Sequence, residues 1–145
     1  MLRLASLLCG LLLALPALAQ EQRIGQIKIA TGAAAIERDG ARRPASAGDP
    51  VFSRDVLRTG VDGTMGLTFI DNTTFATGPN SVVALEEFAF DSANFKGAMI
   101  ADVRQGTLVV TSGDIARSSP DAMKVRTPGA LIGVRGTSFA IQVAP

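Results

Sequence analysis

Residue types that commonly carry chemistry in proteins are missing from this chain. The 145-residue sequence has no histidine, no tryptophan and no tyrosine, and its only cysteine is Cys9. Without histidine, a Ser-His-Asp triad and a histidine metal site are excluded. A single thiol also cannot form a disulfide within the chain. We therefore expect no catalytic residues, no metal and no other cofactor.

The chain also lacks a large excess of charge of either sign. Lysine and arginine number 14 and aspartate and glutamate 13, which gives a formal net charge of +1. A nucleic-acid-binding protein usually carries a clear positive excess, and an acidic disordered chain carries a negative one. The composition therefore argues against both, and we expect no nucleic-acid partner.

Long apolar runs are absent except at the N-terminus. Arg3 precedes an apolar run from Leu4 to Leu15, and Ala17-Leu18-Ala19 is a small-x-small cleavage pattern. This layout predicts a helical signal peptide over residues 1–19, cleaved near Ala19-Gln20. The run is shorter than the roughly 20 residues that a membrane-spanning helix needs. We expect a single exported domain, residues 20–145, periplasmic or extracellular, with no transmembrane segment.

Cys9 offers an alternative, because a lipid-attachment cysteine can also end an export signal. The residue before such a cysteine is normally small, whereas here it is Leu8. The apolar stretch ahead of Cys9 is also shorter than the 7–15 residues typical of the hydrophobic region of a signal peptide. The sequence favours the cleaved signal peptide.

Beyond residue 23 the pattern favours β-structure. Short runs of β-branched and apolar residues alternate with Gly, Pro, Asn and Asp at spacings of about 8–12 residues, which is typical of all-β domains. Asp39-Gly40 and Asp62-Gly63 are hairpin-type turns. The region 81–90 is ambiguous, because Ala84 to Glu87 favours helix and the flanking valines and phenylalanines favour strand. We predict a strand there, and a solvated loop over Asp39–Asp49.

No internal repeat is evident. The pairs Thr31-Gly32, Thr59-Gly60 and Thr77-Gly78 follow one another at unequal spacings, so they do not define a structural repeat. Glu86-Glu87 is no catalytic pair, because neighbouring residues of a strand point to opposite faces. No serine lies in a Ser-x-x-Lys spacing that could activate it without histidine. We therefore expect that the protein is not an enzyme.

A series of motifs resembles the FecR domain family over nearly the whole exported part, from about Gly25 to Val143. Its most specific element is the closing stretch from Thr127-Pro128 to Gly133-Val134-Arg135-Gly136-Thr137 and Phe139. The earlier motifs are, in order, Arg38-Asp39-Gly40, residues 48–60, residues 67–73, Gly78-Pro79-Asn80-Ser81, Gln105-Gly106-Thr107 and Ser112-Gly113.

The resemblance implies an all-β, twisted domain of many short strands, solenoid-like or sandwich-like. Founding members of the family sense iron-siderophore uptake from the inner membrane and control a cytoplasmic sigma factor. This sequence shows neither a cytoplasmic helical region ahead of a spanning helix nor a second domain. We therefore expect a free-standing exported version, to which sigma-factor control does not transfer directly.

We assign structural roles to the residues that carry the resemblance. In the closing motif, Arg135 either pairs with a carboxylate, for which Asp55 and Asp71 are candidates, or supplies the charge of an anion-binding turn; the pair is favoured. The full set is Asp49, Asp55, Thr59, Gly60, Asp71, Thr127, Pro128, Gly133, Arg135, Gly136 and Thr137.

One aromatic cluster is a candidate partner surface. Phe88, Phe90 and Phe95 lie close together in the sequence. Core packing is the default for such a cluster, but Phe95 falls in a predicted loop, where we expect partial exposure. The leading hypothesis is a protein-binding module for an envelope partner in sensing or signalling. A small-ligand or glycan receptor, whose ligand the sequence does not name, and a structural cell-surface protein are the alternatives. Without Trp or Tyr the chain is poorly equipped to stack on sugars.

Overall fold

The computed structural model describes residues 14–17, 21–136 and 138–144, and within them the chain is nearly all β-strand. This confirms the predicted all-β class. Most of the predicted signal peptide lies outside the described residues, and residues 14–17 form neither helix nor strand. The elements are β1 (Gly25–Thr31), β2 (Ala34–Arg38), β3 (Ala41–Pro44), β4 (Pro50–Val51), β5 (Val56–Thr59), β6 (Thr64–Phe69), β7 (Thr74–Thr77), β8 (Val82–Asp91), β9 (Lys96–Thr111), α1 (Asp114–Ser118), β10 (Met123–Thr127), β11 (Ala130–Gly133) and β12 (Ser138–Val143).

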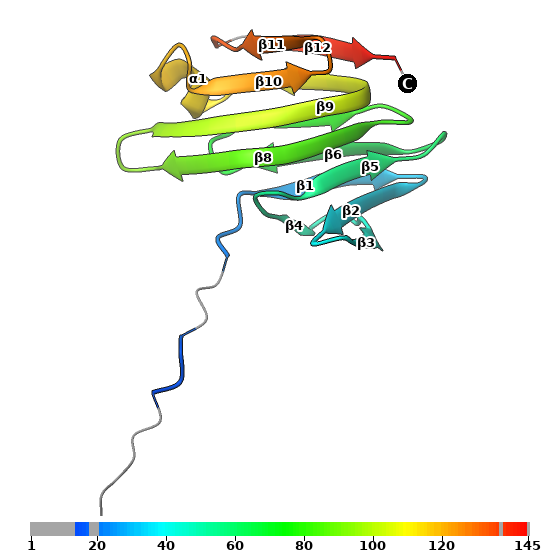
Figure 1. Ribbon diagram of the computed structural model, residues 1–145, viewed down its shortest axis with the longest axis horizontal. Helices are drawn as coiled ribbons and strands as arrows, with labels where there is room; N and C mark the ends of the chain where they lie inside the picture. The colour runs from blue at the N-terminus through cyan, green and yellow to red at the C-terminus, as the bar shows by residue number, and fades with distance from the viewer. Residues whose placement is uncertain (1–13, 18–20, 137, 145) are drawn as a thin grey trace, which may run out of the picture.

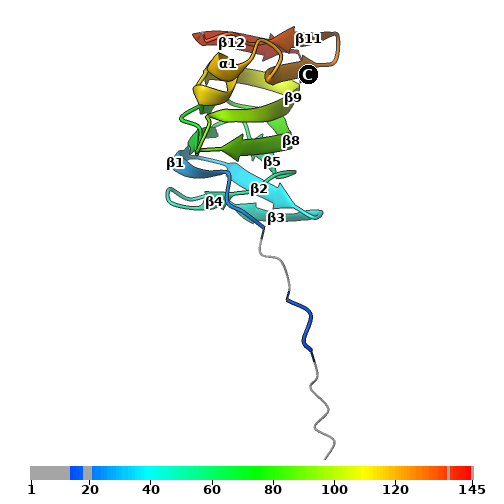
Figure 2. The same ribbon diagram turned by 90° about the vertical axis from the view of Figure 1, so that its left-hand side faces the viewer.

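The strands form one sheet that curls over, so that two layers face each other (Figures 1 and 2). The layer that we call the β8 layer holds β3, β2, β5, β8, the first part of β9, β10 and β11 in that order. The β7 layer holds β4, β1, β6, β7, the last part of β9 and β12. All pairs are antiparallel except β9 with β10. The chain repeatedly passes from one layer to the other, as a solenoid does.

β9 belongs to both layers. Its first part pairs with β8 and β10, and its last part pairs with β7 and β12. Gly106 marks the change of layer, with a φ of +88° that favours glycine. Gln105-Gly106 has the sequence of a turn, but here the glycine bends the strand without ending it.

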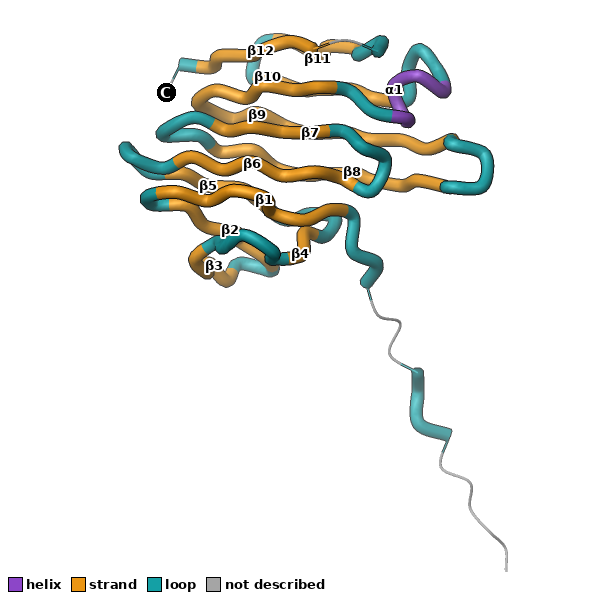
Figure 3. Tube along the Cα trace, turned by 180° about the vertical axis from the view of Figure 1, so that it is seen from behind, coloured by secondary structure: helices purple, strands orange, loops and turns teal. Residues whose placement is uncertain are grey.

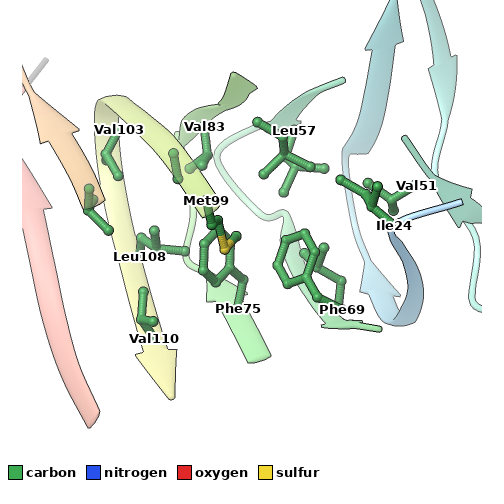
Figure 4. Close-up of a cluster of buried hydrophobic side chains, with 14 of the residues drawn as sticks. Ile24, Val51, Leu57, Phe69, Phe75, Val83, Met99, Val103, Leu108 and Val110 are labelled. Carbon is green, nitrogen blue, oxygen red and sulfur yellow. The ribbon is translucent and has the colours of Figure 1, made fainter. Parts of the chain in front are cut away.

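One hydrophobic core fills the space between the layers (Figure 4). Leu57, Val83 and Met99 enter it from the β8 layer, and Phe69 and Phe75 enter it from the β7 layer. The rings of Phe69 and Phe75 meet edge to face at 4.8 Å between centroids. In β6 the buried side chains fall at alternate positions, as the period of two predicts.

Two further expectations from sequence meet different outcomes. The ambiguous region 81–90 is a strand, β8, as predicted. The region Asp39–Asp49 is not wholly a loop, because β3 occupies Ala41–Pro44 and pairs with β2. Exposure hid this strand from the sequence, since all four residues of β3 are exposed. The only helix in the described part of the chain, α1, has five residues.

No helix among the described residues is long and apolar enough to cross a membrane.

Candidate binding surfaces

Asp55 anchors the start of β5 through a completely buried carboxylate. Arg38 of β2 donates from Nε to Oδ1 at 2.8 Å and from Nη2 to Oδ2 at 2.7 Å, and the Phe52 N–H donates to Oδ2 at 2.9 Å. The guanidinium also lies 4.4 Å from the centre of the Phe52 ring. The hydrogen bond to Asp55 raises the pKa of Arg38 above its ordinary value, and burial opposes this. The bidentate ion pair between Arg38 and Asp55 fixes β2 against β5.

Asp71 lies at the start of the turn before β7, and its carboxylate, like that of Asp55, is hydrogen-bonded within the fold. Its buried carboxylate accepts from the Thr73 hydroxyl at 2.7 Å, from the Thr73 N–H at 3.1 Å and from the Ile115 N–H at 3.2 Å. The Asp71 carbonyl also accepts from the Asp114 N–H at 2.8 Å. Asp71 therefore ties α1 to the turn between β6 and β7.

Thr59 and Gly60 lie at a corner where the chain passes between the layers. The Thr59 hydroxyl donates to the Gly78 carbonyl at 2.7 Å and accepts from the Ser81 N–H at 2.9 Å. The buried Ser81 hydroxyl accepts from the Thr107 N–H at 2.9 Å. Three successive corners are thus joined by threonine and serine hydroxyls.

Asp49 and Thr127 brace turns. The Asp49 carboxylate accepts from the Ser46 N–H at 2.9 Å, and the Asp49 carbonyl accepts from the Ile27 N–H at 2.9 Å. The Thr127 hydroxyl donates to the Ala130 carbonyl at 3.4 Å across the β10–β11 turn, in which Pro128 is exposed.

The closing motif does not place Arg135 in a buried ion pair. Arg135 is exposed, and the carboxylates proposed as its partners are held by Arg38 in one case and by Thr73 and α1 in the other. The predicted pairing with Asp55 or Asp71 is therefore wrong. The buried residue of this motif is Val134, whose N–H donates to the Met123 carbonyl at 3.0 Å.

Among the described residues of the closing motif, the chain bends at Gly136. Gly133 ends β11, Gly136 has a φ of +53°, and Thr137 lies outside the described residues. Arg135 and Gly136 line a shallow hollow beside α1 together with Arg117.

The three candidate phenylalanines separate into core and surface. Phe88 stacks on Phe69 at 5.5 Å between ring centroids and packs against the core. Phe95 lies at the tip of the β8–β9 hairpin, is 56% exposed, and has a φ of +59°. Its ring lies 6.5 Å from that of half-buried Phe90. The hairpin projects beyond the neighbouring strands (Figures 1 and 3), so the Phe90–Phe95 pair is presented at the edge of the molecule.

A groove of about 690 Å³ lies on the outer side of the β8 layer, near the corners at Gly32 and Gly60. Arg42 and Arg43 of β3 and Arg58 of β5 line it. Glu37 accepts from Arg58 Nε at 2.7 Å and from Arg42 Nη2 at 3.4 Å. The hydrogen bond from Arg58 lowers the pKa of Glu37 most, burial opposes it, and Arg42 lowers it further. Sequence reasoning missed this groove because it expected a loop at Arg42 and Arg43.

In the described part of the chain, no three Asp, Glu or Cys side chains come together where they could hold a metal ion. The buried carboxylates of Asp55 and Asp71 are both hydrogen-bonded within the fold.

Comparison with known proteins decides the family. A family model described as FecR protein matches residues 55–145. The chain belongs to the FecR family. No curated protein and no solved structure matches it.

The FecR match begins at Asp55, and the fold extends ahead of it. β1 pairs with β6, and β2 pairs with β5, so strands before the matched residues belong to the same sheet. The resemblance traced from about Gly25 thus corresponds to one continuous fold. The first matched residue, Asp55, is held by Arg38 from the unmatched part. The arginine groove also spans both parts, with Arg42 before the match and Arg58 within it.

Proposed function

We propose that this FecR protein is a non-catalytic, exported binding module for a protein partner in envelope sensing or signalling. Membership of the FecR family suggests a role related to envelope signalling. The proposal includes cleavage near Ala19-Gln20, which N-terminal sequencing of the processed protein tests directly.

The observation that carries the proposal is the conformation of Phe95. A bulky residue at a φ of +59° is unfavourable, and glycine or asparagine would fit this hairpin tip better. The ring is also 56% exposed, so it contributes less to the core than a buried phenylalanine. Strain at an exposed aromatic side chain points to selection for binding, because stability alone would favour another residue.

The surroundings of Phe95 suit a protein contact. Phe90 stands beside it, and a hollow of about 250 Å³ lined by Phe88, Phe90 and Ile70 lies along the same hairpin. Ile70 is 38% exposed. Exposed aromatic residues next to a small hollow are typical anchors of protein interfaces.

The test is a crosslinking capture of the tagged protein from its own cell envelope, with the captured proteins identified by mass spectrometry. Phe95→Asn removes the ring and suits the backbone, so this variant should keep or raise the melting temperature while the captured partner is lost. Val61→Asn is the matched control, because Val61 is 80% exposed at a different turn. Equal capture by wild type and Phe95→Asn, or no enrichment over an unrelated exported protein, would contradict the proposal.

A further inference from the structure

We propose that the arginine groove is a binding site for a small organic carboxylate, a ligand with an apolar body and at least one carboxylate. This inference is independent of the protein partner proposed above, because it rests on other residues. It concerns the groove lined by Arg42, Arg43 and Arg58.

The hollow exists because its floor is built from small residues. Ala33 and Gly60 lie where the β1–β2 and β5–β6 corners meet, Ala35 follows in β2, and longer side chains line the groove around them. Its volume of about 690 Å³ is in the range of pockets that take organic molecules and is much larger than a simple ion needs. The alanine methyl groups offer an apolar surface for the body of such a ligand.

The charge around the groove is positive. Arg42, Arg43 and Arg58 line the groove, whereas the nearby carboxylates are two, Glu37 between Arg42 and Arg58 and Asp62 at the Gly32 corner. Asp62 is already engaged, since it accepts from the Ala33 N–H at 3.1 Å. Arg43 is exposed and has no ion pair within the described residues. A bound anionic group would therefore balance the excess positive charge around the groove.

Glu37 orients Arg58 without using up its donors. The carboxylate accepts from Nε at 2.7 Å, and no acceptor among the described residues takes the two terminal amino groups of Arg58. The side chain is 31% exposed and rises from β5, a strand paired on both sides. A guanidinium that is already held in place loses less conformational entropy when it binds a ligand.

The donors that remain favour a carboxylate over inorganic phosphate. Phosphate sites commonly use several free backbone N–H groups. Here the Gly60 N–H donates to the Ala33 carbonyl at 2.8 Å, and the Ala33 N–H is taken by Asp62. The available donors are the arginine side chains, and a planar guanidinium matches a planar carboxylate through two parallel hydrogen bonds.

Nuclear magnetic resonance titration of the exported, processed protein tests the inference. The probe is adipate, adipamide is the neutral control, inorganic phosphate is the simple anion, and ionic strength is held constant. We expect saturable shifts of the Arg58 Nε–H signal and of the Ala35 and Gly60 amide signals with adipate, and weaker binding of phosphate. Adipamide should cause no saturable shift.

Variants locate the site. Arg42→Gln should weaken adipate binding at least fivefold, and the double variant Arg42→Gln/Arg43→Gln should abolish it, while both retain the wild-type melting temperature within a few degrees. Arg104→Gln, an exposed arginine outside the groove, is the matched control and should change the affinity by less than twofold. Binding that persists in the double variant, shifts centred on Arg135, or phosphate affinity equal to that of adipate would overturn the inference.

Discussion

At the scale of single residues, the buried Asp55 carboxylate accepts three hydrogen bonds, two of them from Arg38. Asp55→Ala removes both hydrogen bonds from Arg38 and the one from the Phe52 N–H. Breaking one side of a buried ion pair leaves the other charge unpaired and costs about 3–5 kcal/mol. Because Arg38 is 29% exposed and can reach water, we expect a loss near the lower end, about 3 kcal/mol, in urea unfolding monitored by circular dichroism.

Asp121→Asn serves as the control for Asp55→Ala, since Asp121 is exposed. It should change the free energy of unfolding by no more than about 0.5 kcal/mol. If Asp55→Ala were as mild as the control, the Arg38–Asp55 pair would not hold β2 against β5.

Glu37 makes stability depend on pH. Its pKa lies below the ordinary value of 4.5 in the folded state, mainly because of the hydrogen bond from Arg58. The stabilisation is therefore complete at pH values above the unfolded pKa and is lost as the pH falls through the lower, folded pKa. We expect Glu37→Gln to destabilise the protein at pH 7 and to approach wild type as the pH falls below the folded pKa of Glu37, in urea titrations at each pH. A difference that stays constant over this range would show that the carboxylate charge is not the cause.

In the closing motif, the sequence suggested that Arg135 is the buried, stabilising residue, whereas the structure buries Val134. Arg135 is exposed, so Arg135→Ala should change the free energy of unfolding by no more than about 0.5 kcal/mol. Val134 is 1% exposed, and Val134→Ala should cost about 2 kcal/mol through the lost packing. Thermal unfolding of the two variants side by side checks the order, and a larger effect at Arg135 would restore the buried-pair hypothesis.

At the scale of elements, the sequence predicts strands well where apolar residues alternate with polar ones. β6 has buried Met65, Leu67 and Phe69 at alternate positions, and the sequence pattern shows this directly. β3 shows no such alternation, because Arg42 and Arg43 are both exposed at the edge of the sheet. Charged residues and proline are common on edge strands, where they discourage pairing with other chains. A strand of this kind has the sequence of a loop.

The Thr-Gly pairs show a second limit of sequence analysis. Their spacing is irregular, yet Thr59-Gly60 and Thr77-Gly78 both lie at corners between the layers and share the network around Ser81. The strands between these corners differ in number and length. Corners of the same kind are therefore separated by unequal numbers of residues along the sequence. Only the pairing of strands shows that the pairs are related.

A substitution at Gly106 tests how tightly its corner is packed. An added Cβ would clash with Ser81, and the φ of +88° is unfavourable for alanine. Gly106→Ala should therefore cost more than about 3 kcal/mol or prevent folding, since strain and overlap add. Gly40→Ala separates the two causes: its φ is +78° with nothing near the added Cβ, and we expect about 1 kcal/mol.

Gly129→Ala completes the Gly106 series in the same denaturant titrations. Nothing lies near its added Cβ, and no positive φ applies, so the effect should be within about 0.5 kcal/mol. If Gly106→Ala and Gly40→Ala cost the same, the contact with Ser81 would not constrain the corner.

At the scale of the whole molecule, the candidate surfaces depend on contacts that the sequence does not reveal. Phe95 could be predicted from its loop position, because an aromatic residue in a turn is noticeable without a structure. The arginine groove could not, since it combines β3 with β5, and Glu37 between them, through strand pairing. The partner of Asp55 could not be predicted either, because Arg38 looks no different from Arg135 in the sequence.

The same pairing predicts how the molecule unfolds. Solenoid-like proteins can unfold from one end, since each repeat contacts only its neighbours. Here β9 pairs with four strands and belongs to both layers, and the Ser81 network joins corners from residues 59 to 107. We therefore expect one cooperative transition. Leu57→Ala in β5, which should cost about 2–5 kcal/mol, should lower hydrogen-exchange protection equally in β2 and in the distant β10. Loss of protection confined to β1–β5, with β10 unchanged, would show instead that the strands ahead of β6 unfold as a separate unit.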